Sequence, residues 1–423
     1  MAQSRASAAK PADSAPAVSR ARRAEATTGR NLVVLLDGTG NELGRNLSNV
    51  LKLFRIAEKG ERQLCFYNPG VGTIARTSPW HRARQKLSAF IGLALGYGLD
   101  DNVLSAYRFL VQNWRDGDQI YLFGFSRGAW TARILGGLIH LIGLVRPEQL
   151  NMCESALGTY KRAASDDDLP LAWHFSRVIG ARRPTIRFIG VWDTVGSVIV
   201  PRPDRFYIPS LETLPYTQTN PSVPTFRHAL ALDERRRMFR VARWTQPQPF
   251  VPNRYKPSQK REQDIEQRWF AGVHSDIGGG YPETESALSK LPLIWMVDAA
   301  VKAGLRINKP SYWHLAYGEQ SKEGQHDYVA PLATGPMHRS LKGFWWLFEV
   351  LPKAVRYREW QRRSVLGFYL PHSEPRTIQP GQVIASSIQN RVQSDTSYRP
   401  VNLEPRAAAP EPPTTPDPSS PVD

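Results

Sequence analysis

One serine in this sequence stands in a pattern that nucleophilic serines use. Residues 124–128 read Gly-Phe-Ser-Arg-Gly, which matches Gly-x-Ser-x-Gly, and they follow the apolar segment 119–123 and open the helical pattern 126–145. Glycines suit such a turn because larger side chains would clash with neighbouring backbone. An ordinary turn with a helix-capping serine would give the same pattern. The strand before it and the helix after it favour Ser126 as a nucleophile.

A serine hydroxyl becomes a good nucleophile only when a histidine accepts its proton and a carboxylate orients that histidine. In the α/β-hydrolase arrangement the three residues follow one another along the chain as serine, acid and histidine. Asp193 comes after Ser126 and directly follows the apolar segment 185–192. It therefore stands at the carboxyl end of an expected strand, where parallel sheets bind ligands. A turn or helix-cap role would explain Asp193 equally well.

Six histidines follow Asp193 and could complete the set. His274 fits best, because it follows the expected strand 267–273 and leads into a glycine-rich loop that could carry an imidazole over the sheet edge. A lone histidine is more often structural, but the order along the chain favours His274 as the base. His228 and His338 are the weaker alternatives, each beside an arginine in less strand-like surroundings.

A glycine-rich turn, Asp37-Gly38-Thr39-Gly40-Asn41, ends the first apolar segment. In a hydrolase of this type, the backbone N–H groups of Thr39 and of Arg127 would bind the oxyanion. A second chemistry is also open, in which Asp37 is the aspartyl nucleophile of a haloacid-dehalogenase-type phosphatase. Thr39 occupies the place of the second acid in that motif, so the phosphatase is the weaker hypothesis.

Four motifs occur in a fixed order along the chain. They cover residues 35–41, 124–133, 190–197 and 270–281 and read LLDGTGN, GFSRGAWTAR, GVWDTVGS and FAGVHSDIGGGY. Together they resemble the catalytic domain of the bacterial type VI secretion lipase effector family one. The resemblance extends over roughly residues 30–300.

This resemblance implies an α/β-hydrolase in which Ser126 is the nucleophile, Asp193 the orienting acid and His274 the base. Some members of the family cleave the acyl esters of phospholipids, so a lipid or other acyl ester is the expected substrate, and peripheral membrane contact is expected with it. We expect Asp37 and Asp276, which lie inside two of the motifs, to support the reacting groups. No cofactor or metal is expected, and the expected protein partner is an immunity or delivery protein.

The segments between these motifs predict the fold class. Apolar segments at 32–36, 63–67, 119–123, 185–192 and 267–273 alternate with helical patterns. Continuous apolar strands separated by helices predict an α/β fold with a mostly parallel sheet and helices on both faces.

The same pattern divides the chain into four parts. We expect residues 1–30 to form a disordered leader, residues 31–300 a catalytic domain, residues 301–398 a C-terminal extension packed on that domain, and residues 399–423 a disordered Pro-rich tail. Within the catalytic domain, the Pro- and Arg-rich stretch at about 195–265 predicts an insertion or lid.

Composition limits the partners and the location. The 423 residues include 55 Lys plus Arg against 38 Asp plus Glu, a net charge of +17 that would attract nucleic acid or an anionic membrane. The basic residues are dispersed and no nucleic-acid-binding motif is present, so we expect no nucleic acid, although a basic binding module without catalysis stays the alternative. No apolar run reaches the roughly 18 residues of a membrane span, and no Sec-type signal is recognisable. We expect a cytoplasmic protein or export by a non-Sec route.

Two further segments carry open interpretations. Residues 343–348 read Gly-Phe-Trp-Trp-Leu-Phe, which is typical of a core helix but could also enter the headgroup region of a membrane. Arg235-Arg236-Arg237 is typical of a solvated helix face and could alternatively bind a phosphate headgroup.

Overall fold

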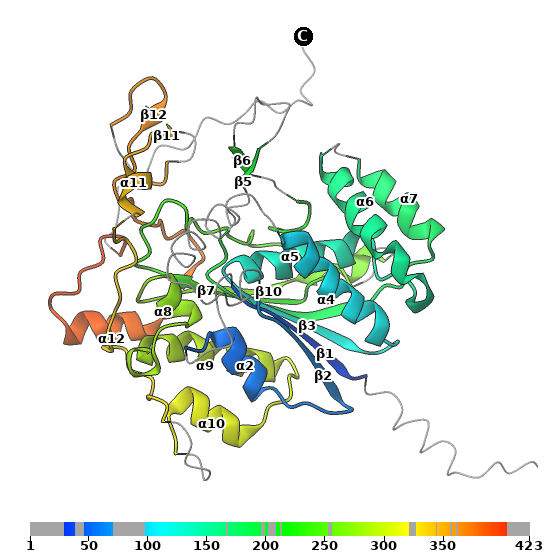
Figure 1. Ribbon diagram of the computed structural model, residues 1–423, viewed down its shortest axis with the longest axis horizontal. Coiled ribbons are helices and arrows are strands. Elements are labelled where there is room, and N and C mark those ends of the chain that lie inside the picture. The colour runs from blue at the N-terminus through cyan, green and yellow to red at the C-terminus, as the bar shows by residue number, and fades with distance from the viewer. Residues whose placement is uncertain are drawn as a thin grey trace, which may run out of the picture.

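Figure 1 shows the computed structural model of the protein as a ribbon diagram. It describes residues 29–38, 46–70, 98–165, 168–195, 199–201, 209–211, 214–252, 256–320, 327–343, 345–355, 358–360 and 363–403. Most of the predicted leader and most of the predicted tail lie outside these ranges.

A seven-stranded sheet forms the centre, and all of its neighbouring strands are parallel. Its strands stand in the order β13-β10-β7-β4-β3-β1-β2. Their bounds are β1 Asn31–Leu36, β2 Gln63–Asn68, β3 Gln119–Phe125, β4 Thr185–Trp192, β7 Thr225–Ala231, β10 Asp264–Phe270 and β13 Val383–Ile384. Every residue of β1 is buried, as a strand covered on both faces requires. The predicted parallel α/β-hydrolase-like sheet is confirmed.

Helices cover both faces of this sheet (Figure 1). Leu32, Val34 and Leu36 of β1 belong to one hydrophobic core, which they share with α4 (Leu99–Asn113), α5 (Arg127–Leu141), α6 (Cys153–Ser165) and α7 (Leu169–Val178). Val33 and Leu35 point the other way, into a second core with α2 (Asn49–Ile56), α9 (Ala287–Lys302) and α10 (Lys309–Tyr317). Side chains alternate between the faces of a strand, so one apolar run supplies both cores.

The sheet takes a strand from a region where the sequence predicts only an insertion. Residues 225–231, inside the Pro- and Arg-rich stretch, form β7 and lie between β4 and β10. The strand reads Thr-Phe-Arg-His-Ala-Leu-Ala. The half-buried Arg227 and the buried His228 interrupt its apolar pattern, so the sequence does not predict this strand.

The C-terminal part also joins the sheet, because β13 pairs with β10 at its edge. The remaining described elements are short: η1 Pro147–Met152, β5 Ile199–Pro201, β6 Pro209–Leu211, β8 Pro249–Phe250, η3 Pro257–Gln259, β9 Arg261–Glu262, α8 His274–Gly278, η4 Glu283–Glu285, α11 Trp345–Glu349, β11 Lys353–Ala354, β12 Phe368–Tyr369 and α12 Ser386–Ser394. Among the helices in the described ranges, none combines the length and the hydropathy needed to cross a bilayer.

Candidate active site

Ser126 lies at a strained turn between β3 and α5. Its φ of 56° is in the left-handed region that side chains rarely adopt. The turn is closed by two glycines: a methyl group on Gly124 would lie 2.3 Å from the carbonyl oxygen of Gly128, and one on Gly128 would lie 2.1 Å from the carbonyl oxygen of Leu36. The Gly-x-Ser-x-Gly pattern is therefore a steric requirement of this turn, which lifts Ser126 out of the sheet.

A chain of hydrogen bonds links Ser126, His274 and Asp193. The Ser126 Oγ lies 2.7 Å from Nε2 of His274, and Nδ1 of the same ring lies 2.5 Å from Oδ2 of Asp193. The three residues are up to 148 positions apart in the sequence. Ser126 and Asp193 directly follow the neighbouring strands β3 and β4, and His274 lies just beyond the end of β10, which β7 separates from β4. This carboxyl edge is where open α/β sheets bind ligands.

The backbone around Asp193 explains how its carboxylate reaches the histidine. Asp193 directly follows β4, has a φ of 39°, and donates its N–H to the carbonyl oxygen of Ala229 at 2.8 Å. Its Oδ1 accepts the N–H of Ala231 at 3.0 Å. The side chain is thus tied to β7, the adjacent strand, and serves neither as a helix cap nor as an ordinary turn residue.

The imidazole of His274 is enclosed by two aromatic rings. Phe125 and Phe239 have ring centroids 4.7 and 4.8 Å from it, and His274 is only 5% exposed. This burial lowers the pKa of His274, and the hydrogen bond to Asp193 partly opposes the change. At neutral pH the ring is uncharged, so Nε2 can accept a proton from Ser126.

Glu234 supports the backbone of His274, a contact that the sequence did not suggest. Its Oε2 accepts the N–H of His274 at 3.2 Å, and the carboxylate is held by Arg236 at 2.8 and 2.9 Å and by the hydroxyl of Ser340. Burial would raise the pKa of Glu234, but the Arg236 guanidinium outweighs it and keeps the carboxyl ionised. The only signal in the sequence was an acid directly before an arginine run.

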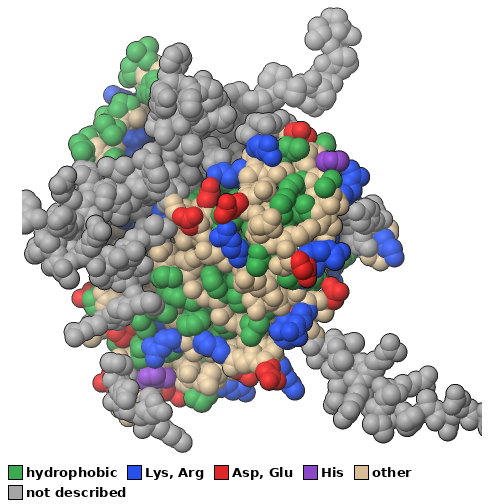
Figure 2. Space-filling view, turned by 45° about the vertical axis from the view of Figure 1, so that its right-hand side comes forward, with side chains coloured by type: hydrophobic (Ala, Val, Ile, Leu, Met, Phe, Trp, Pro, Cys, Tyr) green, Lys and Arg blue, Asp and Glu red, His purple; other side chains and the backbone are tan. Residues whose placement is uncertain are grey.

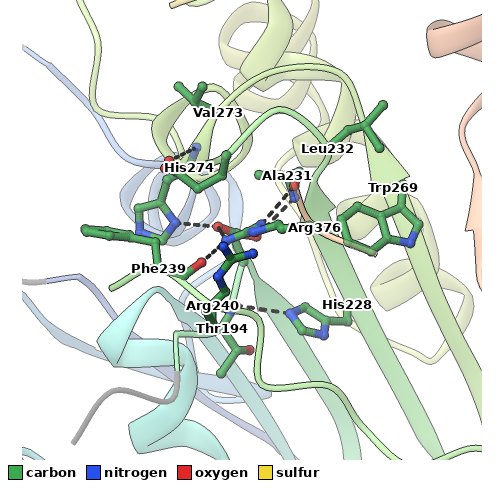
Figure 3. Close-up of polar contacts among 12 residues, drawn as sticks. Thr194, His228, Ala231, Leu232, Phe239, Arg240, Trp269, Val273, His274 and Arg376 are labelled. Atoms are coloured by element: carbon green, nitrogen blue, oxygen red, sulfur yellow. Dashed lines mark hydrogen bonds and ion pairs between the residues drawn. The ribbon is translucent and has the colours of Figure 1, made fainter. Parts of the chain in front are cut away.

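A buried arginine from the C-terminal part also contacts the carboxylate of Asp193. Nη1 and Nη2 of Arg376 lie 2.6 and 3.1 Å from the two carboxylate oxygens. His274 also contacts this carboxylate, and Figure 3 shows Arg376 near His274, with Phe239 beside the imidazole. Burial would raise the pKa of Asp193, but Arg376 and the hydrogen bond from His274 together hold it below the usual range. Nothing in the sequence around Arg376 indicates this contact.

The predicted oxyanion donors are only partly described. Arg127 is the first residue of α5, so its N–H is one of those at the helix start that lack an acceptor within the helix. The Arg127 side chain is buried, which lowers its pKa to about 10, and its Nη2 has no hydrogen-bond partner among the described residues. Thr39 lies outside the described residues, so the second donor stays a prediction.

The two acids predicted to support the reacting groups, Asp37 and Asp276, accept hydrogen bonds from other residues. Oδ2 of Asp37 accepts hydrogen bonds from the hydroxyls of Ser48 and Tyr67, while its Oδ1 accepts the N–H of Gly38. Asp276 lies on α8, where it accepts the N–H of Val273 at 3.0 Å. Within the described ranges, no three His, Cys, Asp or Glu side chains come close enough to hold a metal ion.

The two alternative histidines occupy other positions. His228 is fully buried on β7, where its Nε2 accepts the N–H of Thr194 at 3.1 Å, and burial lowers its pKa to about 3. His338 contacts Asp276 at 2.7 Å and Glu285 at 2.9 Å. Both rings are engaged with these other partners, and His274 is the histidine that the fold brings to the serine.

Two of the interpretations are wrong: residues 235–237 are not a helix face, and residues 345–349 are not a core helix. The arginine run is not part of a helix: Arg236 pairs with Glu234, and Arg237 donates to the carbonyl oxygens of Phe348 and Leu351. Residues 345–349 form the short helix α11. Trp345 packs on Phe239, with ring centroids 5.3 Å apart. Trp346 is 48% exposed, so α11 is not a core helix.

Sequence comparison places this chain in a family. Residues 30–299 match the model described as "T6SS, Phospholipase effector Tle1-like, catalytic domain". The match covers more than half of the chain, and the protein belongs to this family of catalytic domains. The family supports a hydrolase of the lipase or phospholipase type.

Individual relatives are more distant. The uncharacterized protein YEL023C of Saccharomyces cerevisiae is 32% identical over 241 residues, which are 53% of this chain and 34% of that protein. The chain thus spans about a third of the curated relative that it matches. Two solved structures are each 18% identical. An uncharacterized protein from Pseudomonas aeruginosa has a TM-score of 0.37 over 69% of this chain and 48% of its own. The Tle1 effector bound to the VgrG spike of the type VI secretion system has a TM-score of 0.31 over 62% and 53%.

Proposed function

We propose that this protein is a serine hydrolase that cleaves carboxylic esters of lipids through Ser126, His274 and Asp193. The observation that carries the proposal is the unbroken relay from the Ser126 hydroxyl through both nitrogens of one neutral, buried imidazole to a buried carboxylate. This arrangement is the one that serine nucleophiles need. Membership of the Tle1-like phospholipase effector family supports a lipid as the substrate.

In the first half-reaction, the Ser126 oxygen attacks the ester carbonyl while Nε2 of His274 takes its proton. The carbonyl oxygen becomes an anion beside the N–H of Arg127, where the positive end of α5 stabilises it. Asp193 stabilises the imidazolium through the hydrogen bond at Nδ1. His274 then returns the proton to the leaving alcohol, and the acyl group stays on Ser126.

In the second half-reaction, water replaces the alcohol. His274 removes a proton from the water as it attacks the acyl-enzyme, and the proton passes to the Ser126 oxygen when the new tetrahedral species collapses. The products are a carboxylic acid and the free enzyme. No step requires a metal or a cofactor, since each proton is held by Nε2 of His274 between transfers.

An exposed apolar surface next to the site supports a lipid assembly as the form of the substrate. We define the apolar ridge as the exposed large hydrophobic residues of α11 and of the β11–β12 hairpin: Trp346, Leu347, Val350, Leu351, Val365, Leu366, Phe368 and Leu370. This segment projects from the body of the molecule (Figure 1), and green side chains gather on the protruding end in Figure 2. Its base is Trp345, which contacts Phe239, the ring that encloses His274.

The charges around the ridge fit an anionic bilayer. Lys342, Arg358 and Arg363 are exposed, whereas Glu349 is buried and accepts the N–H of Arg237. Apolar side chains surrounded by basic residues bind anionic lipid surfaces both by burying apolar area and by electrostatic attraction. We therefore include peripheral membrane contact through the apolar ridge in the proposed function.

The test uses a fluorophosphonate probe and a panel of phospholipids. Wild-type protein should be labelled at Ser126 and should release fatty acid, whereas S126A should do neither and should keep the wild-type melting temperature. The S126A control separates this protein from a contaminating esterase. Equal release of fatty acid by S126A, or an unlabelled but folded wild-type protein, would overturn the proposal.

A further inference from the structure

We propose that Arg376 is a positioning residue of this site: it fixes and charge-balances the Asp193 carboxylate, so that a segment beyond the matched family region completes the catalytic apparatus. The inference rests on the proposed function of Ser126, His274 and Asp193. The family match ends at residue 299, and Arg376 stands 183 residues after Asp193.

The contact is a two-point ion pair in a fully enclosed place. Both side chains are 0–1% exposed, and each terminal nitrogen of the guanidinium serves one carboxylate oxygen. The planar fork of arginine matches a carboxylate in this geometry, which an ammonium group cannot reproduce. Arg376 therefore fixes the plane of the carboxylate as well as its charge.

The arginine is itself held by the backbone of the neighbouring elements. Nη1 donates to the carbonyl oxygen of Ala231 at 2.8 Å, and Nη2 donates to that of Phe239 at 2.5 Å. Ala231 ends β7, and Phe239 carries one of the rings that enclose His274. Arg376 thus ties together the three pieces that surround the imidazole: the acid, the end of β7 and the aromatic wall.

The positive charge of Arg376 should favour the neutral form of His274. The charged groups facing the ring are Asp193, Glu234 and Arg236, with Arg376 behind Asp193; Asp276, on the same short helix, is paired with His338. Removing the positive charge of Arg376 leaves the Asp193 charge less balanced, which stabilises the protonated imidazole. His274 would then stay protonated, and inactive as a base, up to a higher pH.

The experiment measures the rate of fluorophosphonate labelling against pH in the full-length protein. R376Q removes the charge but keeps an N–H donor, and R376K keeps the charge but loses the two-point geometry. R391M is the matched control, because Arg391 is also a buried arginine of the C-terminal part, bound to the carbonyl oxygens of Ala333 and Gly335. Circular dichroism tests whether each variant is folded.

We expect the acid limb of the R376Q profile to move up by about one pH unit, which lowers labelling on that limb about tenfold. R376K should keep the wild-type limb with a lower plateau, and R391M should keep both. An R376Q limb that coincides with the wild-type limb would overturn the inference. If R376Q does not fold, R376K provides the test. An R376K labelling rate that reaches the wild-type plateau, or an R376K acid limb shifted to higher pH, would also overturn the inference.

Failure of the proposed function gives a different result. If Ser126 is not a nucleophile, the wild-type protein is not labelled at any pH. If wild-type Ser126 is labelled and the R376Q and R376K profiles match the wild-type profile, the catalytic proposal stands and the role of Arg376 is rejected.

Discussion

Gly128 lies so close to Leu36 that a methyl group at its α-carbon would be 2.1 Å from the Leu36 carbonyl oxygen. The two residues belong to α5 and β1, so this approach sets how closely the helix after the serine packs on the sheet. The atom that a methyl group would meet belongs to the backbone of β1, so it cannot move aside as the end of a flexible side chain can.

G128A should therefore destabilise the protein by about 1–3 kcal/mol or more, because α5 must shift away from β1. The shift would also move Ser126, so labelling should fall. Denaturant unfolding measures the stability. Gly158 on α6 is the matched control, since a methyl group there would have no atom within 4 Å beyond its own helix backbone and chain neighbours, and G158A should raise stability by up to about 1 kcal/mol. Equal stability of the two variants would contradict the packing argument.

The pH dependence of labelling should show the low pKa of His274. Burial lowers the pKa of this ring, so it stays neutral and active as a base at pH values below its ordinary 6.5. The midpoint of the fall in labelling rate on the acid side should therefore lie below pH 6.5, because the imidazole becomes protonated only there. Stopped-flow labelling of wild-type protein measures the profile. A midpoint at or above pH 6.5 would contradict the expected effect of burial on the His274 pKa.

His228 should contribute to acid denaturation. Its pKa is about 3 in the folded protein against 6.5 for an unperturbed histidine, chiefly because of burial. Above pH 6.5 neither state is protonated, and its contribution is fully present. Between pH 6.5 and 3 only the unfolded state binds the proton, so stability is lost as the pH falls, by up to about 1.4 kcal/mol per unit.

H228Q tests this assignment, because glutamine can accept the Thr194 N–H but does not titrate. The wild-type protein should lose more stability than H228Q between pH 7 and pH 4 in urea unfolding experiments. Parallel losses in the two proteins would mean that His228 is not the titrating group.

Membrane binding should depend on the apolar ridge. Leu366 and Phe368 are 93% and 52% exposed, so L366D and F368D should fold normally and weaken binding to anionic vesicles by roughly tenfold each, given the burial energy of such side chains. Vesicle co-sedimentation in an S126A background keeps the lipid intact. With Ser126 intact, L366D and F368D should turn over a water-soluble short-chain ester at the wild-type rate.

V178D is the matched control, since Val178 is 71% exposed at the end of α7, away from the apolar ridge. It should bind vesicles like the parent protein. Equal binding by L366D and the parent protein would remove the apolar ridge from the proposed function.

Local patterns were sufficient for the central part of this protein. The apolar runs predicted β1, β3 and β4 to within about two residues, because buried parallel strands are apolar throughout. The turn at Ser126 was predictable because only glycine fits beside the backbone of Leu36. The order of Ser126, Asp193 and His274 predicted the three side chains that the structure joins by hydrogen bonds.

Tertiary structure alone decided the rest. β7 carries His228 and Arg227, and these polar residues are accommodated by partners distant in sequence, such as Thr194 and Asp264. Arg376 reaches Asp193 only because the C-terminal part folds back over the end of β7. A buried charge needs an opposite charge as a partner. The local sequence does not indicate which distant residue will be that partner, as with Asp193 and Arg376.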